Sequence, residues 1–252
     1  IRDRLSPALL DRVADEADRP VKALLLTTPD NPLGRVYSPT ELDEILDWAE
    51  GRGLHVVVDE IYALSVFGER EFTSCAKVRP SLGDRMHIVW AFSKDFGASG
   101  LRCGVLVSEN EAVNAAVDAL AYWACCSGHT QHLLGELVSD EAWVDGFVDT
   151  VRTELGGAYG RLRSLLETGG VAHVPAQAGV FTLLDLRAFL PEPTWDAERT
   201  LWLGILAEAR VNLTPGSACH VGEPGFMRLC FAGQPRATVE VGVERLVRAL
   251  GR

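Results

Sequence analysis

A serine and a lysine follow directly on an apolar stretch in the segment VWAFSKDFGASGLRCG, residues 89–104. Of the 24 lysine and arginine residues in the chain, only Lys22, Lys77 and Lys94 are lysines, so arginine supplies nearly all of the surface cations. Lys94 stands where a buried strand is expected to end. A lysine amine can act as a nucleophile, which a guanidinium does not do. We therefore interpret Lys94 as a candidate for chemistry.

The elements around Lys94 follow an alternating order. Continuous apolar runs predict three buried strands, over residues 21–28 (VKALLLTT), 54–60 (LHVVVDE) and 87–93 (HIVWAFS). Residues 38–53 predict a helix between the first two, with Ser38 as N-cap and Glu41 three residues later. This pattern predicts a parallel sheet covered on both faces. Residues 103–108 follow too soon for a helical crossover, so we expect an antiparallel or edge strand there.

Polar residues follow the ends of these strands. In an open α/β sheet, ligands bind beyond the carboxyl ends of the strands, so these residues are expected to share one edge. They are Asn31, Asp59, Tyr62, Ser93, Lys94 and Arg102.

Lys94 and Asp59 together fit pyridoxal 5'-phosphate (PLP). A lysine amine can form a Schiff base with the PLP aldehyde. A carboxylate such as Asp59 can hold the pyridine nitrogen protonated, which makes the ring an electron sink. Asn31 and Tyr62 can hydrogen-bond the phenolic oxygen of the ring. The hydroxyl of Ser93 and the forked donors of Arg102 suit a phosphate.

Taken one at a time, these residues have ordinary explanations. Asp59 could cap a turn, and Tyr62 could be an ordinary half-buried packing residue. Arg102 could be a solvated surface charge, and Lys94 could be a surface residue whose aliphatic part packs on the protein while its amine stays in water. The order Asn-Pro-x-Gly, Asp-Glu-x-Tyr, Ser-Lys and Gly-x-Arg-x-Gly, each after its own strand, favours the functional interpretation. His129 and His132 are one helical turn apart, but no third ligand is evident, so no metal site is predicted.

The second half of the chain has a different pattern. Residues 109–168 are helical in character, and short strands are expected afterwards over 179–186, 211–215 and 226–232, with helices near 195–210 and 235–251. This is an α+β layout. We therefore expect two domains, with residues 1–145 as the C-terminal part of a large cofactor-binding domain and residues 146–252 as a small C-terminal domain.

These motifs resemble those of the fold-type I PLP-dependent enzymes of aminotransferase class I/II, most closely the 1-aminocyclopropane-1-carboxylate (ACC) synthase branch. The similar segments include TTPDNPLGRVYSPTELDEILDWAEGRGLHVVVDEIYALSVFG, SKDFGASGLRCG, AGVFTLLDL and NLTPGSACHVGEPGFMRLCFA. The resemblance implies the α/β PLP-dependent transferase fold. Its large domain has a mostly parallel sheet, incomplete here, and its smaller C-terminal domain is α+β.

The resemblance also implies a role for each candidate residue. Lys94, Asp59 and Tyr62 are the implied catalytic residues, and Lys94 carries the cofactor. The implied cofactor-binding set is Asn31, Asp59, Tyr62, Ser93, Lys94 and Arg102. Arg228, with Asn31, is the implied binding site for the substrate α-carboxylate. Arg228 stands in the apolar run FMRLCFA, where an arginine normally has an anionic partner, and the alternative is a structural ion pair.

The resemblance to ACC synthases implies an enzyme that acts on an amino acid through an external aldimine, with S-adenosyl-L-methionine (SAM) as substrate and chemistry at Cγ. One alternative is a class I/II aminotransferase that transfers the amino group to a keto acid. A second alternative is a non-catalytic subunit with the PLP fold. The intact pair of Lys94 and Asp59 speaks against this last possibility.

Composition sets further expectations. The net charge of −11 argues against nucleic acid or an anionic membrane as a partner. The six cysteines lack CxxC spacing, which favours free thiols and a cytoplasmic protein. Members of the family have a further N-terminal segment, and residues 1–252 contain no counterpart of it. We expect such a segment, or a separate chain, to complete the large domain, and the functional unit to be a homodimer.

Overall fold

The computed structural model describes residues 4–251, in two compact units. Among the described residues, the first unit contains 4–30 and Val36–Val151, and the second contains Asn31–Arg35 and 152–251. The expected domains, 1–145 and 146–252, stay a prediction, and their residues 1–3 and 252 lie outside the described residues.

The first unit is built on a four-stranded sheet with the order β1-β2-β3-β4. Strands β1 (Ala23–Thr27), β2 (His55–Asp59) and β3 (Met86–Ala91) are parallel, and β4 (Gly104–Ser108) runs antiparallel to β3 at the edge. The predicted strands and the antiparallel edge strand are therefore confirmed. Helices of this unit are α1 (Pro7–Asp15), α2 (Pro39–Gly51), α3 (Cys75–Val78), α4 (Phe92–Asp95), α5 (Glu111–Ala124) and α6 (Gly128–Ser139). Helix α7 (Glu141–Thr168) begins in this unit and continues into the second.

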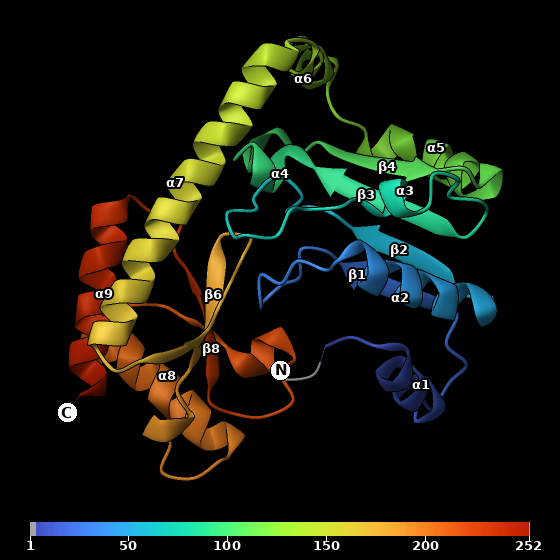
Figure 1. Ribbon diagram of the computed structural model, residues 1–252. Coiled ribbons are helices and arrows are strands. Elements are labelled where there is room, and N and C mark those ends of the chain that lie inside the picture. The colour runs from blue at the N-terminus through green and yellow to red at the C-terminus, as the bar shows by residue number, and fades with distance from the viewer. Residues whose placement is uncertain (1–3, 252) are drawn as a thin grey trace. The chain divides into compact units, whose positions relative to one another are not determined.

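Helix α2 covers one face of the sheet (Figure 1). Ser38 caps it as predicted: its Oγ accepts a hydrogen bond from the Glu41 amide at 3.2 Å, and the Glu41 carboxylate accepts one from the Ser38 amide at 2.8 Å. Apolar side chains of the helix and the sheet then form one core cluster. Its central members are Leu26, Leu42, Ile45, Leu46, Val56, Val58 and Ile88.

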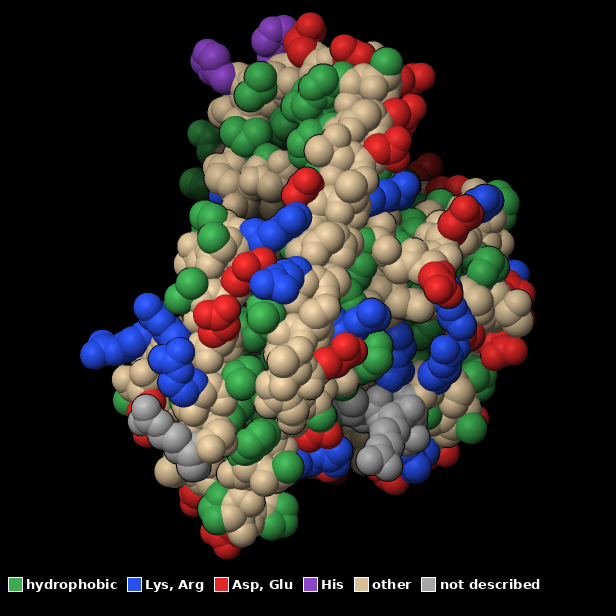
Figure 2. Space-filling view, turned by 60° about the vertical axis from the view of Figure 1, so that its left-hand side comes forward, with side chains coloured by type: hydrophobic (Ala, Val, Ile, Leu, Met, Phe, Trp, Pro, Cys, Tyr) green, Lys and Arg blue, Asp and Glu red, His purple; other side chains and the backbone are tan. Residues whose placement is uncertain are grey.

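The opposite face of the sheet is less covered than expected. Leu25 of β1 points to that face and is 69% exposed, so the prediction of a sheet buried on both faces is wrong for this strand within residues 4–251. Exposed apolar side chains also gather on the helices that follow β4. They include Leu133 and Val138 of α6 and Trp143 at the start of α7, in the region where Figure 2 shows hydrophobic side chains at the surface.

The second unit has an antiparallel sheet with the order β5-β6-β8-β7. Its strands are β5 (Ala172–Val174), β6 (Phe181–Asp185), β7 (Thr214–Pro215) and β8 (Phe226–Cys230), and its further helices are α8 (Trp195–Ala209) and α9 (Arg236–Leu250). Short 3-10 turns cover Ser99–Leu101, Arg187–Phe189 and Gly216–Cys219, the first of them in the first unit. The predicted α+β layout is confirmed, although the strand expected over 211–215 is reduced to two residues. No helix among the described residues is both long and apolar enough to pass through a membrane.

A histidine pair links β2 to β3. Nδ1 of His55 lies 3.0 Å from Nε2 of His87, and Nδ1 of His87 lies 2.8 Å from the Ser108 hydroxyl on β4. Burial lowers the pKa of His87, and the neighbouring His55 lowers it further. The folded state therefore binds this proton less readily than the unfolded chain, whose histidine pKa is about 6.5.

We expect the free energy of unfolding to fall as the pH drops from about 7.5 to 5.5, because protonation of His87 favours the unfolded chain. Urea unfolding at these two pH values measures the change, and in His87→Gln the difference between them is expected to shrink. A variant with the same pH dependence as the wild type would show that other groups control it.

Candidate active site

The first group of predicted site residues lies at the carboxyl ends of β2 and β3. Asp59 is the last residue of β2, and Tyr62 follows in the next turn. Ser93 and Lys94 belong to the one-turn helix α4, which starts directly after β3. Because β2 and β3 are parallel and neighbouring, their following residues share one edge of the sheet, as the sequence predicted.

Asp59 is a half-buried carboxylate with capacity for a further partner. Its Oδ1 accepts a hydrogen bond from the Ile61 amide at 3.1 Å. Burial raises the pKa of Asp59, and the Ile61 amide opposes this rise. Within residues 4–251, no cation pairs with this carboxylate, so a positively charged or proton-donating group of a ligand would stabilise its ionised form.

The Lys94 side chain is exposed, and its amine contacts no carboxylate or other acceptor within the described chain. The backbone around it is closed by local hydrogen bonds: the Gly97 amide binds the Lys94 carbonyl at 3.1 Å, and the Phe92 amide binds the Cys103 carbonyl at 3.3 Å. Gly97 has a φ of +61°, a left-handed conformation that glycine adopts without steric cost. Local hydrogen bonds therefore fix the backbone of this turn, while the Lys94 amine has no partner within the described residues.

Arg102 ends the same turn. Its guanidinium is exposed and donates from Nη1 to the Ser99 carbonyl at 2.9 Å, which leaves its other donors available. Its backbone is left-handed, with a φ of +51°, a conformation that few non-glycine residues adopt. Tyr62 is buried, and its carbonyl accepts from the Ser65 amide at 3.1 Å.

The second group lies in the second unit and consists of Asn31 and Arg228. Nη1 of Arg228 donates to Oδ1 of Asn31 at 2.8 Å, across 197 positions of sequence. Nη2 of Arg228 lies 3.5 Å from the Thr214 hydroxyl, and the guanidinium carbon lies 5.4 Å from the centre of the Phe181 ring. No carboxylate of the described chain forms an ion pair with Arg228, so the structural ion pair that the sequence left open is absent there. A half-buried guanidinium that has no carboxylate partner within the described residues is suited to an anionic ligand.

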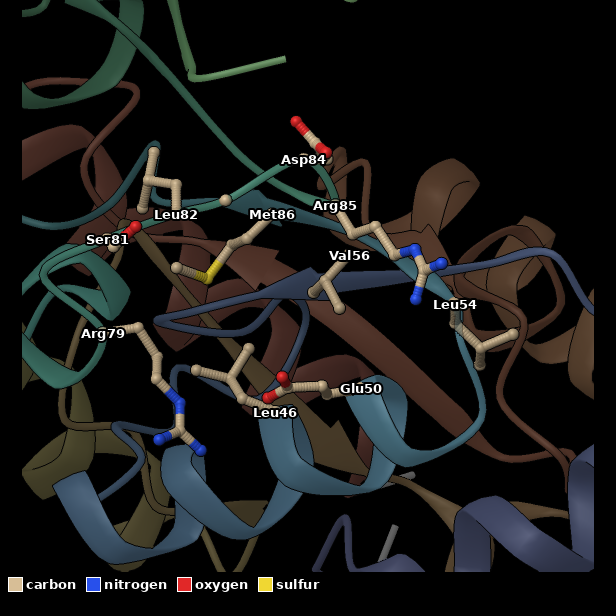
Figure 3. A pocket seen from close by; sticks show the side chains of 11 residues that line it. Leu46, Glu50, Leu54, Val56, Arg79, Ser81, Leu82, Asp84, Arg85 and Met86 are labelled. Atoms are coloured by element: carbon tan, nitrogen blue, oxygen red, sulfur yellow. The ribbon is translucent and has the colours of Figure 1, made fainter.

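A cavity of about 420 Å³ opens elsewhere in the first unit (Figure 3). Its lining includes Leu46 and Glu50 of α2, Val56 near the start of β2, Arg79, and Met86 at the start of β3. These are the amino ends of the strands, opposite to Asp59 and Lys94. The cavity therefore contains none of the predicted site residues.

The fold and these residues define a class of protein. The sequence matches the family model "Aminotransferase class I and II" over residues 6–246. The chain belongs to this family, whose members are PLP-dependent enzymes.

Among known proteins, the chain is similar to 1-aminocyclopropane-1-carboxylate synthase 11 of Arabidopsis thaliana, with 38% identity over 90% of this chain and 50% of the relative. It is also similar to 1-aminocyclopropane-1-carboxylate synthase 2 of Cucurbita pepo, with 36% identity over 92% of this chain and 48% of the relative. The chain thus spans about half the length of these curated relatives.

Solved structures show the same fold. An aromatic aminotransferase from Pyrococcus horikoshii OT3 superposes with a TM-score of 0.86 at 24% identity, over 98% of this chain and 64% of that chain. An aspartate aminotransferase from Thermus thermophilus with maleate superposes with a TM-score of 0.82 at 24% identity, over 97% and 60% of the two chains. Both similarities bear on the fold alone.

The residues at the sheet edge fit PLP. The exposed Lys94 amine has no competing partner, and the Asp59 carboxylate accepts only one hydrogen bond within the described chain. At the end of β1, the Thr28 hydroxyl is buried and has no hydrogen-bond partner among the described residues, so this edge also contains an unsatisfied polar atom. A lysine, a carboxylate and phosphate-compatible donors are the groups that the cofactor requires.

Three residues near the candidate site were not predicted from the sequence. Phe181 and Thr214 flank Arg228, but neither carries a motif, and strand pairing brings them close to it. Asp95 follows Lys94 and accepts a hydrogen bond from Trp90, and its position next to the lysine is the sequence signal that indicates it.

Proposed function

We propose that this chain forms part of a PLP-dependent enzyme that acts on an amino acid in the manner of an ACC synthase, with SAM as the substrate. The observation that carries the proposal is a Lys94 amine without a partner among the described residues and a half-buried Asp59 carboxylate, both at the carboxyl ends of neighbouring parallel strands. The similarity to ACC synthases over nine tenths of the chain supports this choice of reaction.

PLP, when bound, supplies an aldehyde for covalent attachment and a ring that withdraws electrons from the substrate Cα. Lys94 Nζ carries the cofactor and moves the proton at Cα. Asp59 keeps the pyridine nitrogen protonated, and burial makes it sensitive to the charge of that partner. Tyr62 and Asn31 bind the phenolic oxygen, and Ser93 and Arg102 bind the phosphate.

Arg228 binds the α-carboxylate of the amino acid in this proposal. Its donors form a fork that matches a carboxylate, and the contact with Asn31 holds the guanidinium in place. In the SAM reaction, the bond between Cγ and sulfur breaks as Cα attacks Cγ, so methylthioadenosine leaves with the electron pair.

We also propose that the functional unit is a homodimer.

The reaction is tested by incubating the full-length protein with PLP and SAM, without a keto acid, and identifying products by mass spectrometry. Methylthioadenosine released over many turnovers supports the proposal. If SAM stays intact while an amino acid converts bound PLP to pyridoxamine phosphate, and turnover requires a keto acid, the protein is an aminotransferase instead. If neither reaction occurs although PLP binds, the non-catalytic alternative is favoured.

Arg228→Lys is expected to raise KM for the amino acid roughly 10- to 100-fold with a smaller change in kcat, because lysine keeps the charge but loses the fork. Steady-state kinetics measure both constants. Arg187→Lys is the matched control, since Arg187 is also half-buried in the second unit but is paired with Asp185. An unchanged KM in Arg228→Lys, or an equal change in the control, would contradict the assignment.

A further inference from the structure

Asp95 is a buried carboxylate next to the candidate catalytic lysine. Its residue is 2% exposed, and it closes the one-turn helix α4 that also carries Lys94. Successive residues of a helix point about 100° apart, so an inward Asp95 is compatible with an outward Lys94. The exposed Lys94 side chain agrees with this geometry.

Three donors from two other segments converge on the Asp95 carboxylate. The Ser65 hydroxyl donates to Oδ1 at 2.5 Å, while the Leu64 amide donates to Oδ2 at 3.1 Å and Trp90 Nε1 donates to Oδ2 at 2.9 Å. Leu64 and Ser65 belong to the loop after β2 that contains Tyr62, and Trp90 belongs to β3. A single side chain thus joins the two segments that follow β2 and β3.

Besides the Asp95 side chain, helix α4 is held within the described residues by backbone hydrogen bonds such as that from the Phe92 amide to the Cys103 carbonyl. It is four residues long, and its N-cap Ala91 offers no side-chain hydrogen bond. So short a helix is not stable without tertiary contacts. Burial raises the pKa of Asp95, while hydrogen bonds from Ser65, Trp90 and Leu64 oppose that rise. A buried carboxylate needs such donors to offset the loss of its hydration.

We propose that Asp95 is a positioning residue, which fixes the direction of Lys94 relative to the loop of Tyr62 through its hydrogen bonds to Ser65, Leu64 and Trp90. This inference rests on the proposed function of Lys94 and assigns a new role within the same site. Asp95 touches neither cofactor nor substrate in this role. It acts through the backbone of α4.

The chemistry of the carboxylate suggests a pair of diagnostic variants. Asp95→Asn introduces a nearly isosteric side chain: its amide oxygen can accept from Leu64 and Trp90, and its amide nitrogen can donate to the Ser65 hydroxyl, which both donates and accepts. This variant is therefore expected to preserve the position of Lys94. Asp95→Ala leaves the Ser65 hydroxyl, the Leu64 amide and the Trp90 indole without this acceptor and is expected to release α4.

The test uses the site at which PLP becomes attached in the full-length protein. Borohydride fixes PLP to whichever lysine holds it, and peptide mapping distinguishes Lys94 from Lys22 and Lys77. Equilibrium dialysis gives the Kd for PLP. In Asp95→Ala, we expect a roughly tenfold higher Kd and a smaller trapped share on Lys94, while Asp95→Asn stays near the wild type.

Glu198→Ala is the matched control for a loss of stability. Glu198 is another buried carboxylate, in the second unit, and accepts from the Ser217 and Gly225 amides at 3.1 and 2.7 Å. This variant is expected to unfold at a lower temperature and yet trap PLP on Lys94. If Asp95→Ala does not fold, the double variant Ser65→Ala with Trp90→Phe removes two donors and keeps the carboxylate. This double variant is also expected to have a higher Kd for PLP and a smaller trapped share on Lys94.

The outcomes separate the two proposals. If the wild type does not trap PLP on Lys94, the proposed function fails. If the wild type does so and Asp95→Ala matches it in Kd and in trapped share, the positioning role is wrong. That role is also wrong if Asp95→Asn is as impaired as Asp95→Ala, or if Glu198→Ala shows the same loss.

Discussion

Lys94→Ala is expected to lower turnover by about 10⁴-fold or more, because the variant lacks both the amine that attaches PLP and the base that moves the Cα proton. The exposed side chain makes no hydrogen bond or ion pair within the described residues, so its removal is expected to leave the midpoint of thermal unfolding nearly unchanged. Turnover, the trapped PLP on each lysine and the unfolding midpoint are the three measurements.

Lys77→Ala is the control for this prediction, since Lys77 is also exposed and lies on the short helix α3. It is expected to retain wild-type turnover and attachment of PLP at Lys94. Trapping of PLP on Lys22 or Lys77 in the wild type, or turnover by Lys94→Ala within tenfold of the wild type, would remove Lys94 from the mechanism.

Asp59→Asn is expected to lower turnover roughly 100-fold or more, about 3 kcal/mol in activation free energy, because a neutral amide cannot hold the pyridine nitrogen protonated. The midpoint of thermal unfolding is expected to rise or to stay unchanged. Burial raises the pKa of Asp59, so the fold disfavours its charge at neutral pH, and an amide can still accept from the Ile61 amide. Kinetics and thermal unfolding at pH 7.5 together measure this separation.

Asp84→Asn is a suitable control, since Asp84 is exposed and precedes β3 at the opposite end of the sheet. It is expected to change neither turnover nor unfolding. A loss of only a few-fold in Asp59→Asn, together with lower stability, would instead identify Asp59 as a structural cap of the turn that contains Ile61.

The predictable features of this chain are those set by short-range sequence. Ser38 and Glu41 are three residues apart, and their reciprocal hydrogen bonds formed as predicted. The positions of Asp59 and Lys94 at one edge followed from two apolar runs with an intervening crossover, because parallel strands present their carboxyl ends together.

Contacts between distant segments cannot be predicted from short-range sequence. Asp95 receives donors from residues about 30 positions earlier, and nothing in the local pattern specifies which loop will face it. The contact of Asn31 with Arg228 spans 197 positions, and the sequence placed Asn31 among the strand ends of the first half of the chain. The exposure of Leu25 also does not follow from the sequence, because an apolar run does not reveal whether the described chain covers both faces of a strand.

The aromatic surroundings of the Lys94 turn have an optical consequence. Trp90 donates its indole N–H to Asp95, and Phe96, two residues after Lys94, stacks against Phe147 at 5.2 Å and against Trp143 at 6.4 Å. Two indoles thus flank the backbone that carries the reactive amine. Near-ultraviolet emission from Trp90 and Trp143 therefore offers a label-free signal for motion of this turn, and a chromophore attached at Lys94 would accept their excitation energy. The other tryptophans contribute background that single Trp→Phe variants can subtract.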